Sequence, residues 1–282
     1  MSLAKFFEQV FGSSEIQQGN VLAHGWRPDL HYLIMSRGVT EAVFYDRKAS
    51  QIAVENFRSE HFLRVCCYPQ LLQKLAPLQD KRVCDFGCGD GKLAVTLALR
   101  GARVDAFDIS SEYIRLAEQY AALNQVEVQF SVMNAEQTQY PSNSFDFVVG
   151  NAIVHHLNVP RAAEEVRRIL KPGGRAYFWE PSAGNPLLQF ARLHLPYPHK
   201  DRTPDEAPLT TSSLELFDGV EHRELLESAC RLLPAHKTPA LMAFERPLRD
   251  ALCMVDHTIF ALFPPLKRLG RMVLVELQKP TA

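Results

Sequence analysis

The stretch VCDFGCGDGKLAV, residues 83–95, restricts the possible folds of this 282-residue chain more than any other feature. A short apolar run that contains Asp85 ends in glycines at every second position, Gly87, Gly89 and Gly91. Glycine tolerates positive φ and lets a ligand approach the backbone closely. The stretch therefore predicts a buried strand, a glycine turn and a helix, which are typical of an α/β sheet that binds its ligand at the turn.

Two common glycine motifs for phosphate-bearing ligands do not match this turn. Dinucleotide-binding proteins have G-x-G-x-x-G, whose third glycine lets helix and strand pack closely, and Lys92 occupies that third position. The phosphate-binding loop G-x-x-x-x-G-K-[ST] also fails, because Leu93 follows Gly91 and Lys92. A nicotinamide-dependent oxidoreductase on the same sheet remains a rival hypothesis, and Lys92 argues against it.

Strands and helices alternate from residue 81 onward. Short apolar runs predict strands at 82–86, 103–108, 126–133, 144–150 and 175–180, and amphipathic segments predict helices at 92–101, 112–124 and 161–170. This alternation is typical of a doubly wound, mostly parallel sheet, here of seven strands, with ligands bound outside the carboxyl ends of the strands. Polar residues fall at five such ends: Asp85, Asp108, Asn134, Asn151 and Glu180. They predict one coherent site.

The rest of the chain is organised around this core as one continuous domain. Residues 1–80 are expected to be a helical lid or substrate region, with Pro69 interrupting one of its helices. Residues 81–181 form the core, and 182–282 complete the sheet. In that last part we expect cap insertions at 182–220 and 247–270, and we also predict a helix at 221–233 and strands within 237–245 and 271–280.

Charge, cysteine spacing and apolar runs argue against several classes of partner and site. A net charge of −1 gives no overall basic footprint for nucleic acid, although a local basic patch stays open, and 46% apolar residues suit a globular core. The six cysteines have no C-x-x-C spacing, which favours reduced thiols, no metal site and a cytoplasmic location. No apolar run approaches a membrane span of about 18 residues, and the first residues lack the continuous apolar region of a signal peptide.

Five motifs together resemble a known family. The segment DFGCGDG resembles motif I of the class I S-adenosylmethionine-dependent methyltransferases, D/E-x-G-x-G-x-G, in their UbiE-like, small-molecule type. Further similar segments are FDIS at 107–110, the stretch 132–157, the Lys-Pro-Gly-Gly turn and strand within 164–181, and VFYDRKAS at 43–50. The resemblance implies the Rossmann-like methyltransferase fold, S-adenosylmethionine as cofactor and S-adenosylhomocysteine as product.

The resemblance also implies roles for residues at the strand ends. Asp85 would help fix the ammonium group of the cofactor, and Asp108 would accept hydrogen bonds from both ribose hydroxyls. Asn134 stands where the family more often has aspartate, and an amide can also meet the adenine edge. The full set of implied cofactor-binding residues is Tyr45, Asp85, Gly87, Cys88, Gly89, Gly91, Asp108, Ile109, Asn134, Ala135 and Asn151.

Three residues are candidates for catalysis. His155 and His156 follow the fourth predicted strand, and histidine is the usual general base near neutral pH. Glu180 ends the fifth strand on the side where substrate is expected. A structural role for either histidine stays open. Asp256 and His257 could form an acid/base pair. Neighbouring side chains on a helix point in different directions, however, so a structural role is favoured for both.

The resemblance implies methyl transfer by in-line displacement to a small acceptor at oxygen, nitrogen or carbon, and the apolar insertions favour a hydrophobic or aromatic one. Aligning the acceptor can supply much of the rate, and the apolar insertions would form its pocket. Gly-Asn-Ala-Ile follows the fourth strand in place of D/N-P-P-Y/F, which argues against nucleobase methylation. One alternative is a non-catalytic, cofactor-binding regulatory module. The segment IFALFPPLKRLGRM could also rest on a membrane surface, although a lid helix is favoured.

Overall fold

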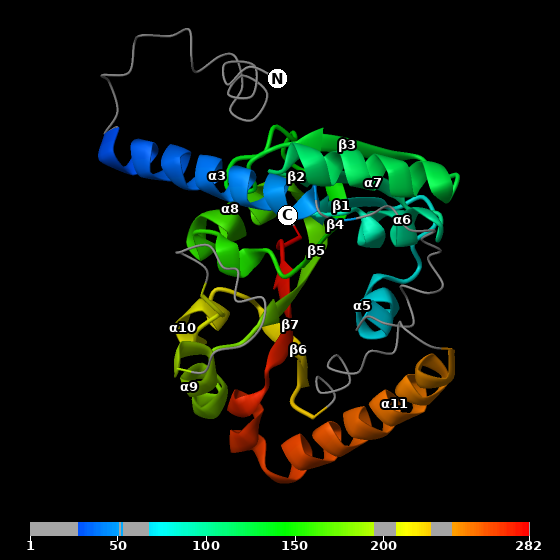
Figure 1. Cartoon of the computed structure of the whole chain (residues 1–282), viewed down its shortest axis with the longest axis vertical. Coiled ribbons are helices and arrows are strands. Elements are labelled where there is room, and N and C mark those ends of the chain that lie inside the picture. The colour runs from blue at the N-terminus through cyan, green and yellow to red at the C-terminus, as the bar shows by residue number, and fades with distance from the viewer. Residues whose placement is uncertain (1–27, 51, 53–67, 195–206, 227–238, 282) are drawn as a thin grey trace, which may run out of the picture.

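A seven-stranded sheet forms the centre of the protein. The computed structural model describes residues 28–50, 52, 68–194, 207–226 and 239–281 (Figure 1). The strand order is β3-β2-β1-β4-β5-β7-β6, and β7 runs antiparallel to both neighbours while the others run parallel. The strands are β1 (Arg82–Phe86), β2 (Arg103–Asp108), β3 (Val128–Val132), β4 (Phe145–Asn151), β5 (Leu170–Pro181), β6 (Gly219–Glu224) and β7 (Met272–Gln278). The predicted mostly parallel sheet is confirmed.

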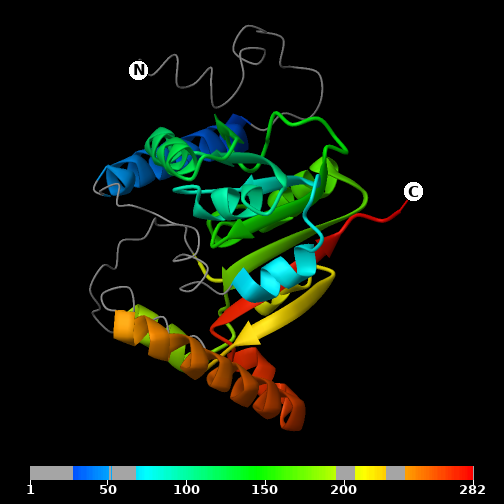
Figure 2. The same ribbon diagram turned by 90° about the vertical axis from the view of Figure 1, so that its right-hand side faces the viewer.

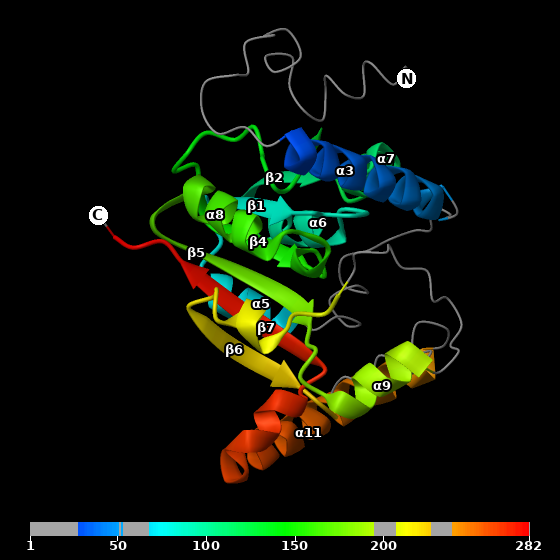
Figure 3. The same ribbon diagram turned by 90° about the vertical axis from the view of Figure 1, so that its left-hand side faces the viewer.

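Helices cover both faces of the sheet (Figures 2 and 3). Successive residues of β1 point to opposite faces, so Val83 belongs to one buried cluster and Cys84 to another. Helices α5 (Tyr68–Leu75) and α6 (Lys92–Ala98) pack on the first cluster, and α8 (Val159–Ile169) packs on the second. Burial on both faces explains why these strands read as continuous apolar runs.

Helix α7 (Ser111–Leu123) begins as its sequence predicts. The side-chain oxygen of Ser110 accepts a hydrogen bond from the backbone N–H of Tyr113, at 3.1 Å. Ile114, Ala117 and Ala121 are all buried, as expected for residues on one face. Helix α3 (Pro28–Ala49) packs against α7 near the carboxyl edge of the sheet (Figure 1).

The segments between β5 and β7 add helices at one end of the molecule (Figures 1 and 3). These are α9 (Pro186–His194), α10 (Thr211–Leu214), α11 (Pro239–Leu262) and the 3-10 helix η4 (Pro264–Leu269). The Asn185 side chain donates to the carbonyl of Leu269 at 3.0 Å, which joins the start of α9 to the end of η4. Among the described helices, none combines the length and the apolar character needed to cross a membrane.

Two predicted elements are wrong. The described part of the expected helix 221–233 continues the edge strand β6, and its remainder lies outside the described residues. The strand GVEHRE carries Glu221, Arg223 and Glu224, and charged residues are typical of edge strands. The expected strand within 237–245 belongs to the long helix α11, because a short apolar run cannot by itself distinguish a strand from part of a helix.

Several predicted boundaries also move. Helix α6 ends at Ala98, and Gly101 adopts φ 84 in the turn before β2. Helix α8 ends at Ile169, so the Lys-Pro-Gly-Gly turn lies inside the long strand β5. Pro69 lies in the first turn of α5, where proline is tolerated, and the expected helical stretch before it lies outside the described residues. The predicted division at residues 80 and 181 stays a prediction.

The described cysteines have no disulfide. Cys84, Cys88 and Cys253 are free thiols, and burial raises the pKa of the Cys84 and Cys88 thiols well above their ordinary value. Both thiols lie in the core of the sheet as small apolar groups. Cys66, Cys67 and Cys230 lie outside the described residues.

Candidate functional site

The glycine turn lies between the end of β1 and the start of α6. Gly87, Gly89 and Gly91 have φ values of 72, 51 and 76, all in the left-handed region that favours glycine. A Cβ atom at Gly91 would lie 2.5 Å from the Cβ of Ala117 on α7, so this glycine permits close helix packing. A Cβ atom at Gly89 would meet no atom of the described residues within 4 Å. The backbone of Gly89 therefore borders open space.

Asp108 connects this turn to the end of β2. Its Oδ2 accepts a hydrogen bond from the N–H of Gly89, and its Oδ1 accepts one from the N–H of Ser110, each at 2.9 Å. Burial raises the pKa of Asp108 to about 6, against the lowering effect of these backbone donors. A carboxylate has about four acceptor positions, so Asp108 keeps acceptor capacity for a ligand beside Gly89.

Asp85 is a buried carboxyl beneath the turn. It is 1% exposed, and within the described part of the chain its Oδ2 has no hydrogen-bond partner. Burial raises the pKa of Asp85 to about 8, and a hydrogen bond from the Ala94 backbone only partly offsets this. A buried carboxyl with an unpartnered oxygen suits a cationic or hydrogen-bond-donating ligand.

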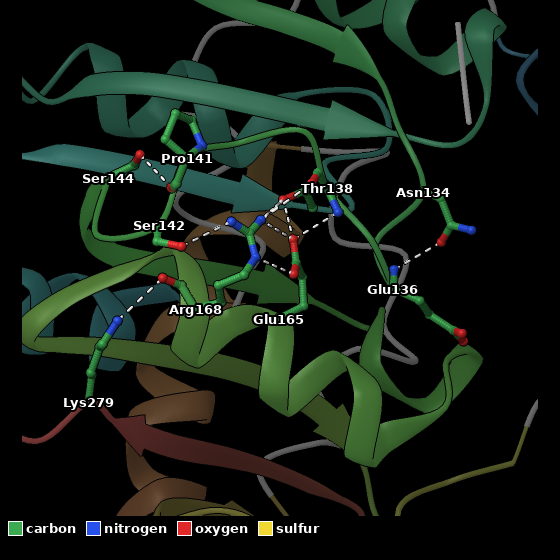
Figure 4. Close-up of polar contacts among 9 residues, drawn as sticks. All are labelled: Asn134, Glu136, Thr138, Pro141, Ser142, Ser144, Glu165, Arg168 and Lys279. Atoms are coloured by element: carbon green, nitrogen blue, oxygen red, sulfur yellow. Dashed lines mark hydrogen bonds and ion pairs between the residues drawn. The ribbon is translucent and has the colours of Figure 1, made fainter. Parts of the chain in front are cut away.

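The loop after β3 carries Asn134 and Ala135, both buried. The side-chain oxygen of Asn134 accepts from the N–H of Glu136 at 2.9 Å, which closes a tight local turn (Figure 4). The amide nitrogen of Asn134 points away from Glu136 in this view. The side-chain oxygen of Asn134 thus fixes the loop backbone, and its amide nitrogen is the group left to meet a ligand.

A charged network that the sequence analysis missed anchors this loop to α8 (Figure 4). Glu165 is buried, and its Oε1 accepts from the Thr138 N–H at 2.8 Å and from the Thr138 hydroxyl at 2.5 Å. Arg168 donates to both oxygens of Glu165, at 2.6 and 2.7 Å. These contacts lower the pKa of Glu165 despite its burial. An acidic residue on the buried face of an amphipathic helix was the available signal.

We expect Glu165→Gln to destabilise the protein by about 1–3 kcal/mol, because the buried Thr138 hydroxyl and the Arg168 guanidinium lose a charged acceptor. Urea unfolding of the full chain measures this change. Glu164→Gln is the matched control, since Glu164 is the exposed neighbour on the same helix. Equal destabilisation by the two variants would contradict a specific role for Glu165.

The two histidines lie in the 3-10 helix η1 (Val154–His156) after β4. Nδ1 of His155 lies 2.7 Å from Oε2 of Glu180, and the other Glu180 oxygen accepts from the N–H groups of Ile153 and Val154. Glu180 is fully buried, and its expected substrate contact stays a prediction. Its contacts make Glu180 a positioning residue for η1.

Helix α3 folds over the same edge of the sheet. The Tyr45 hydroxyl lies 3.3 and 3.2 Å from the ring nitrogens of His156, and the two rings meet edge to face. Asp46, which was not predicted as a site residue, accepts at its Oδ1 from the Ser110 hydroxyl at 2.6 Å and from the Glu112 N–H at 3.1 Å. An aspartate at the amino end of α7 suits the helix dipole. Tyr45 and Asp46 thus fix α3 against the site.

The other expected residues take varied positions. Cys88 is buried, and its N–H donates to the carbonyl of Phe107 at 2.8 Å, which ties the turn to β2. Ile109 is half-buried directly after Asp108, and Asn151 is exposed at the end of β4. Asp256 is fully buried and accepts from the backbone N–H groups of Leu225 and Leu226, so it anchors α11.

Comparisons with known proteins identify similar chains. The family model described as "Methyltransferase domain" matches residues 84–178. The chain is 35% identical over 99 residues to a protein of Agrobacterium fabrum named "Ubiquinone biosynthesis O-methyltransferase". The aligned region covers 35% of this chain and 40% of that protein. It is 37% identical over 125 residues to an uncharacterized methyltransferase of Mycobacterium bovis, covering 43% of this chain and 62% of the relative. The chain thus spans less than two thirds of either relative.

Two solved structures share the fold. A methyltransferase candidate from Bacillus halodurans C-125 aligns with a TM-score of 0.51 and 19% identity, covering 76% of this chain and 99% of the other. The YcgJ protein from Bacillus subtilis aligns with a TM-score of 0.50 and 20% identity, covering 75% and 97%. At this identity, the likeness concerns the arrangement of sheet and helices.

Proposed function

We propose that this chain, a member of the methyltransferase-domain family over residues 84–178, transfers a methyl group from S-adenosylmethionine to a small acceptor. One observation carries the proposal. The Asp108 carboxylate is hydrogen-bonded to the Gly89 backbone, and Gly89 borders open space at the carboxyl edge of the sheet. A ligand there would have a carboxylate and a bare backbone on the same side.

The residues present fit this cofactor. Asp85 offers an unpartnered buried oxygen, which suits the ammonium group of the methionine part. Asp108 retains acceptor capacity for two vicinal hydroxyls, and the half-buried Ile109 next to it offers an apolar surface for a base. Asn134 and Ala135 on the next loop would meet the edge of that base. S-adenosylmethionine has no diphosphate, so it does not require a positive charge in the glycine turn.

When bound, S-adenosylmethionine supplies a methyl group on a sulfonium, already a strong electrophile. The chain's own residues then have to align the acceptor and exclude water. We propose that Tyr45 and His156 close the site at its methionine end, with Asn151 nearby. Glu180 holds His155 in place, because its carboxylate contacts the His155 ring and the backbone N–H groups that begin η1.

The acceptor is proposed to be a hydrophobic or aromatic small molecule. The segments after β5, which border the carboxyl edge, expose or half-bury many Leu, Phe and Pro side chains. One similar protein is named for ubiquinone biosynthesis, a name consistent with an apolar acceptor in that relative. The methylated atom remains open between oxygen, nitrogen and carbon. The non-catalytic alternative has no support in the comparisons, whose relatives carry methyltransferase names.

The test uses methyl-labelled S-adenosylmethionine and a cell extract, followed by separation of organic-soluble from acid-precipitable label. We expect label in the organic phase. Asp108→Ala should abolish it, because the variant loses both the ligand acceptor and the brace on Gly89. Asp105→Ala, on the same strand but paired with Arg82 at the protein surface, is the matched control.

Each other outcome has a clear meaning. Label in the precipitate would move the acceptor to protein or nucleic acid. If the wild type and Asp108→Ala give equal label, the proposed site is wrong. If the wild type binds S-adenosylhomocysteine but produces no label with any extract, the non-catalytic module is favoured instead.

A further inference from the structure

Helix α11 exposes an apolar stripe to solvent. Its inward face carries Asp256 and Phe260, which are 0% and 6% exposed. Its outward face is formed by residues spaced three or four apart, which share one side of a helix. These exposed residues are Ala251, Met254, Val255, Thr258, Ala261 and Leu262. None of these six is charged, and exposed Asp250 and His257 lie at one margin of this side of the helix.

The stripe continues into an apolar tip with adjacent positive charges. Leu262 and Phe263 are 69% and 59% exposed, and Pro264 and Pro265 after them are exposed as well. Lys267 and Arg268 follow on η4, and both are exposed. No described residue forms an ion pair with either side chain. The segment 257–275 contains no aspartate or glutamate.

Helix α9 adds to the same end of the molecule (Figures 1 and 3). Leu187 and Phe190 are 79% and 59% exposed and lie three residues apart, on one side of the helix. The start of α9 is tied to η4 through Asn185 and Leu269. Exposed large apolar side chains therefore gather at this end, and gathered patches mark interaction sites more often than scattered ones do.

We propose that this end of the protein, formed by the outward faces of α9, α11 and η4, docks on an anionic lipid surface. An apolar face next to exposed cations is the pattern of a helix that lies in the plane of a membrane interface. The apolar side chains would enter the acyl boundary, and Lys267 and Arg268 would meet anionic headgroups. The proposed contact is peripheral, because the helix lies in the plane of the interface.

A second copy of this chain is the main competing occupant. In a two-fold interface the same patch meets itself, so Lys267 and Arg268 of both copies would approach one another. The segment 257–275 offers no carboxylate to neutralise them. An anionic membrane provides that counter-charge, which is why the charges favour lipid over self-association.

Docking here would place the carboxyl edge of the sheet near the bilayer, because α9 follows the end of β5 and η4 leads into the start of β7. If methyl transfer is also correct, the enzyme could take a lipid-soluble acceptor directly from the membrane. The docking proposal itself does not depend on methyl transfer, and its test measures no activity.

The test is co-sedimentation of the full-length chain with vesicles of phosphatidylcholine alone or with a quarter of phosphatidylglycerol. We expect wild type to bind the anionic vesicles, and binding to weaken with salt. Lys267→Gln with Arg268→Gln should lower the partition coefficient on anionic vesicles about 30-fold, the factor for two cations at such a surface. Leu262→Ser with Phe263→Ser should lower it by about tenfold or more.

Val43→Ser with Leu123→Ser is the matched control, because these side chains are 57% and 51% exposed elsewhere on the protein. Absence of binding to both vesicle types would overturn the proposal, as would an equal loss in the control. A third outcome would assign the patch to a second copy of the chain. In that case the wild type is a dimer without lipid, Leu262→Ser with Phe263→Ser converts it to a monomer, and neither protein binds vesicles. The Lys267 and Arg268 variant stays informative if the Leu262 and Phe263 variant fails to fold.

Discussion

Alanine at Gly89 should weaken the binding of S-adenosylhomocysteine about 100-fold while the protein stays folded. Within the part of the chain that the structure describes, the added methyl group meets no atom within 4 Å, so it would occupy the open space in which the cofactor is proposed to lie. Crowding of this kind costs about 1–3 kcal/mol, and the upper value corresponds to that loss of affinity. The left-handed φ of 51 adds a strain of about 1–2 kcal/mol to the fold itself.

Gly91→Ala should instead lose more folding stability than cofactor affinity. Its φ of 76 brings the same backbone strain, and its Cβ would lie 2.5 Å from the Ala117 Cβ and 3.0 Å from the Ala117 Cα. Because the backbone of α7 cannot move aside cheaply, we expect destabilisation of about 2–5 kcal/mol. The loss of affinity should be no more than the loss of folded protein explains.

Urea unfolding and calorimetric titration with S-adenosylhomocysteine separate the two effects. The pair is informative because both variants make the same chemical change at the same kind of backbone conformation. If Gly89→Ala binds as tightly as wild type, the cofactor does not lie against this glycine. If both variants lose affinity only in proportion to stability, the turn has a structural role alone.

The part of the chain that the sequence predicts best is buried on both sides. Strands such as Arg82–Phe86 are continuous apolar runs because helices cover both faces, and the glycine turn after this strand has a local conformational reason. Asp108 was placed correctly at a strand end for the same reason. Its hydrogen bond to the Gly89 N–H joins residues 19 apart, and no local pattern shows such a contact.

The errors fall where tertiary contacts decide. The edge strand Gly219–Glu224 is charged and pairs only with β7, so its sequence lacks the apolar signal of a central strand. The expected substrate contact of Glu180 stays a prediction, but its hydrogen bonds from three backbone N–H groups, 25 to 27 residues away, were not predicted. Asp46 and Glu165 were missed because their partners are 64 and 27 residues away.

Replacing Asp85 with asparagine should make stability much less dependent on pH. In the folded protein, burial raises the pKa of Asp85 from 3.8 to about 8. Between these values the folded chain holds a proton that the unfolded chain has released, so raising the pH favours unfolding. One such group changes the free energy of unfolding by about 1.4 kcal/mol per pH unit, or about 6 kcal/mol across the whole window. An asparagine amide is neutral at every pH in this window, so Asp85→Asn removes this dependence.

Urea unfolding at pH 5, 7 and 8.5 measures the effect. We expect Asp85→Asn to be more stable than wild type at pH 8.5, with the difference shrinking toward pH 5. Asp105→Asn is the control, because Asp105 lies on the neighbouring strand and pairs with Arg82. The measured quantity is the stability of the wild type relative to Asp85→Asn. If it does not fall between pH 5 and pH 8.5, Asp85 is ionised in the folded protein.

The same carboxyl connects stability to cofactor binding. If the ammonium group of S-adenosylhomocysteine binds beside Asp85, its positive charge lowers the pKa of that carboxyl, and the proton held at pH 7 is released. Titration calorimetry in buffers of different ionisation enthalpy should therefore report release of up to about one proton per bound molecule at pH 7. Asp85→Asn should release none. Equal proton release by wild type and variant would place the ammonium group away from Asp85, because no other change separates the two proteins.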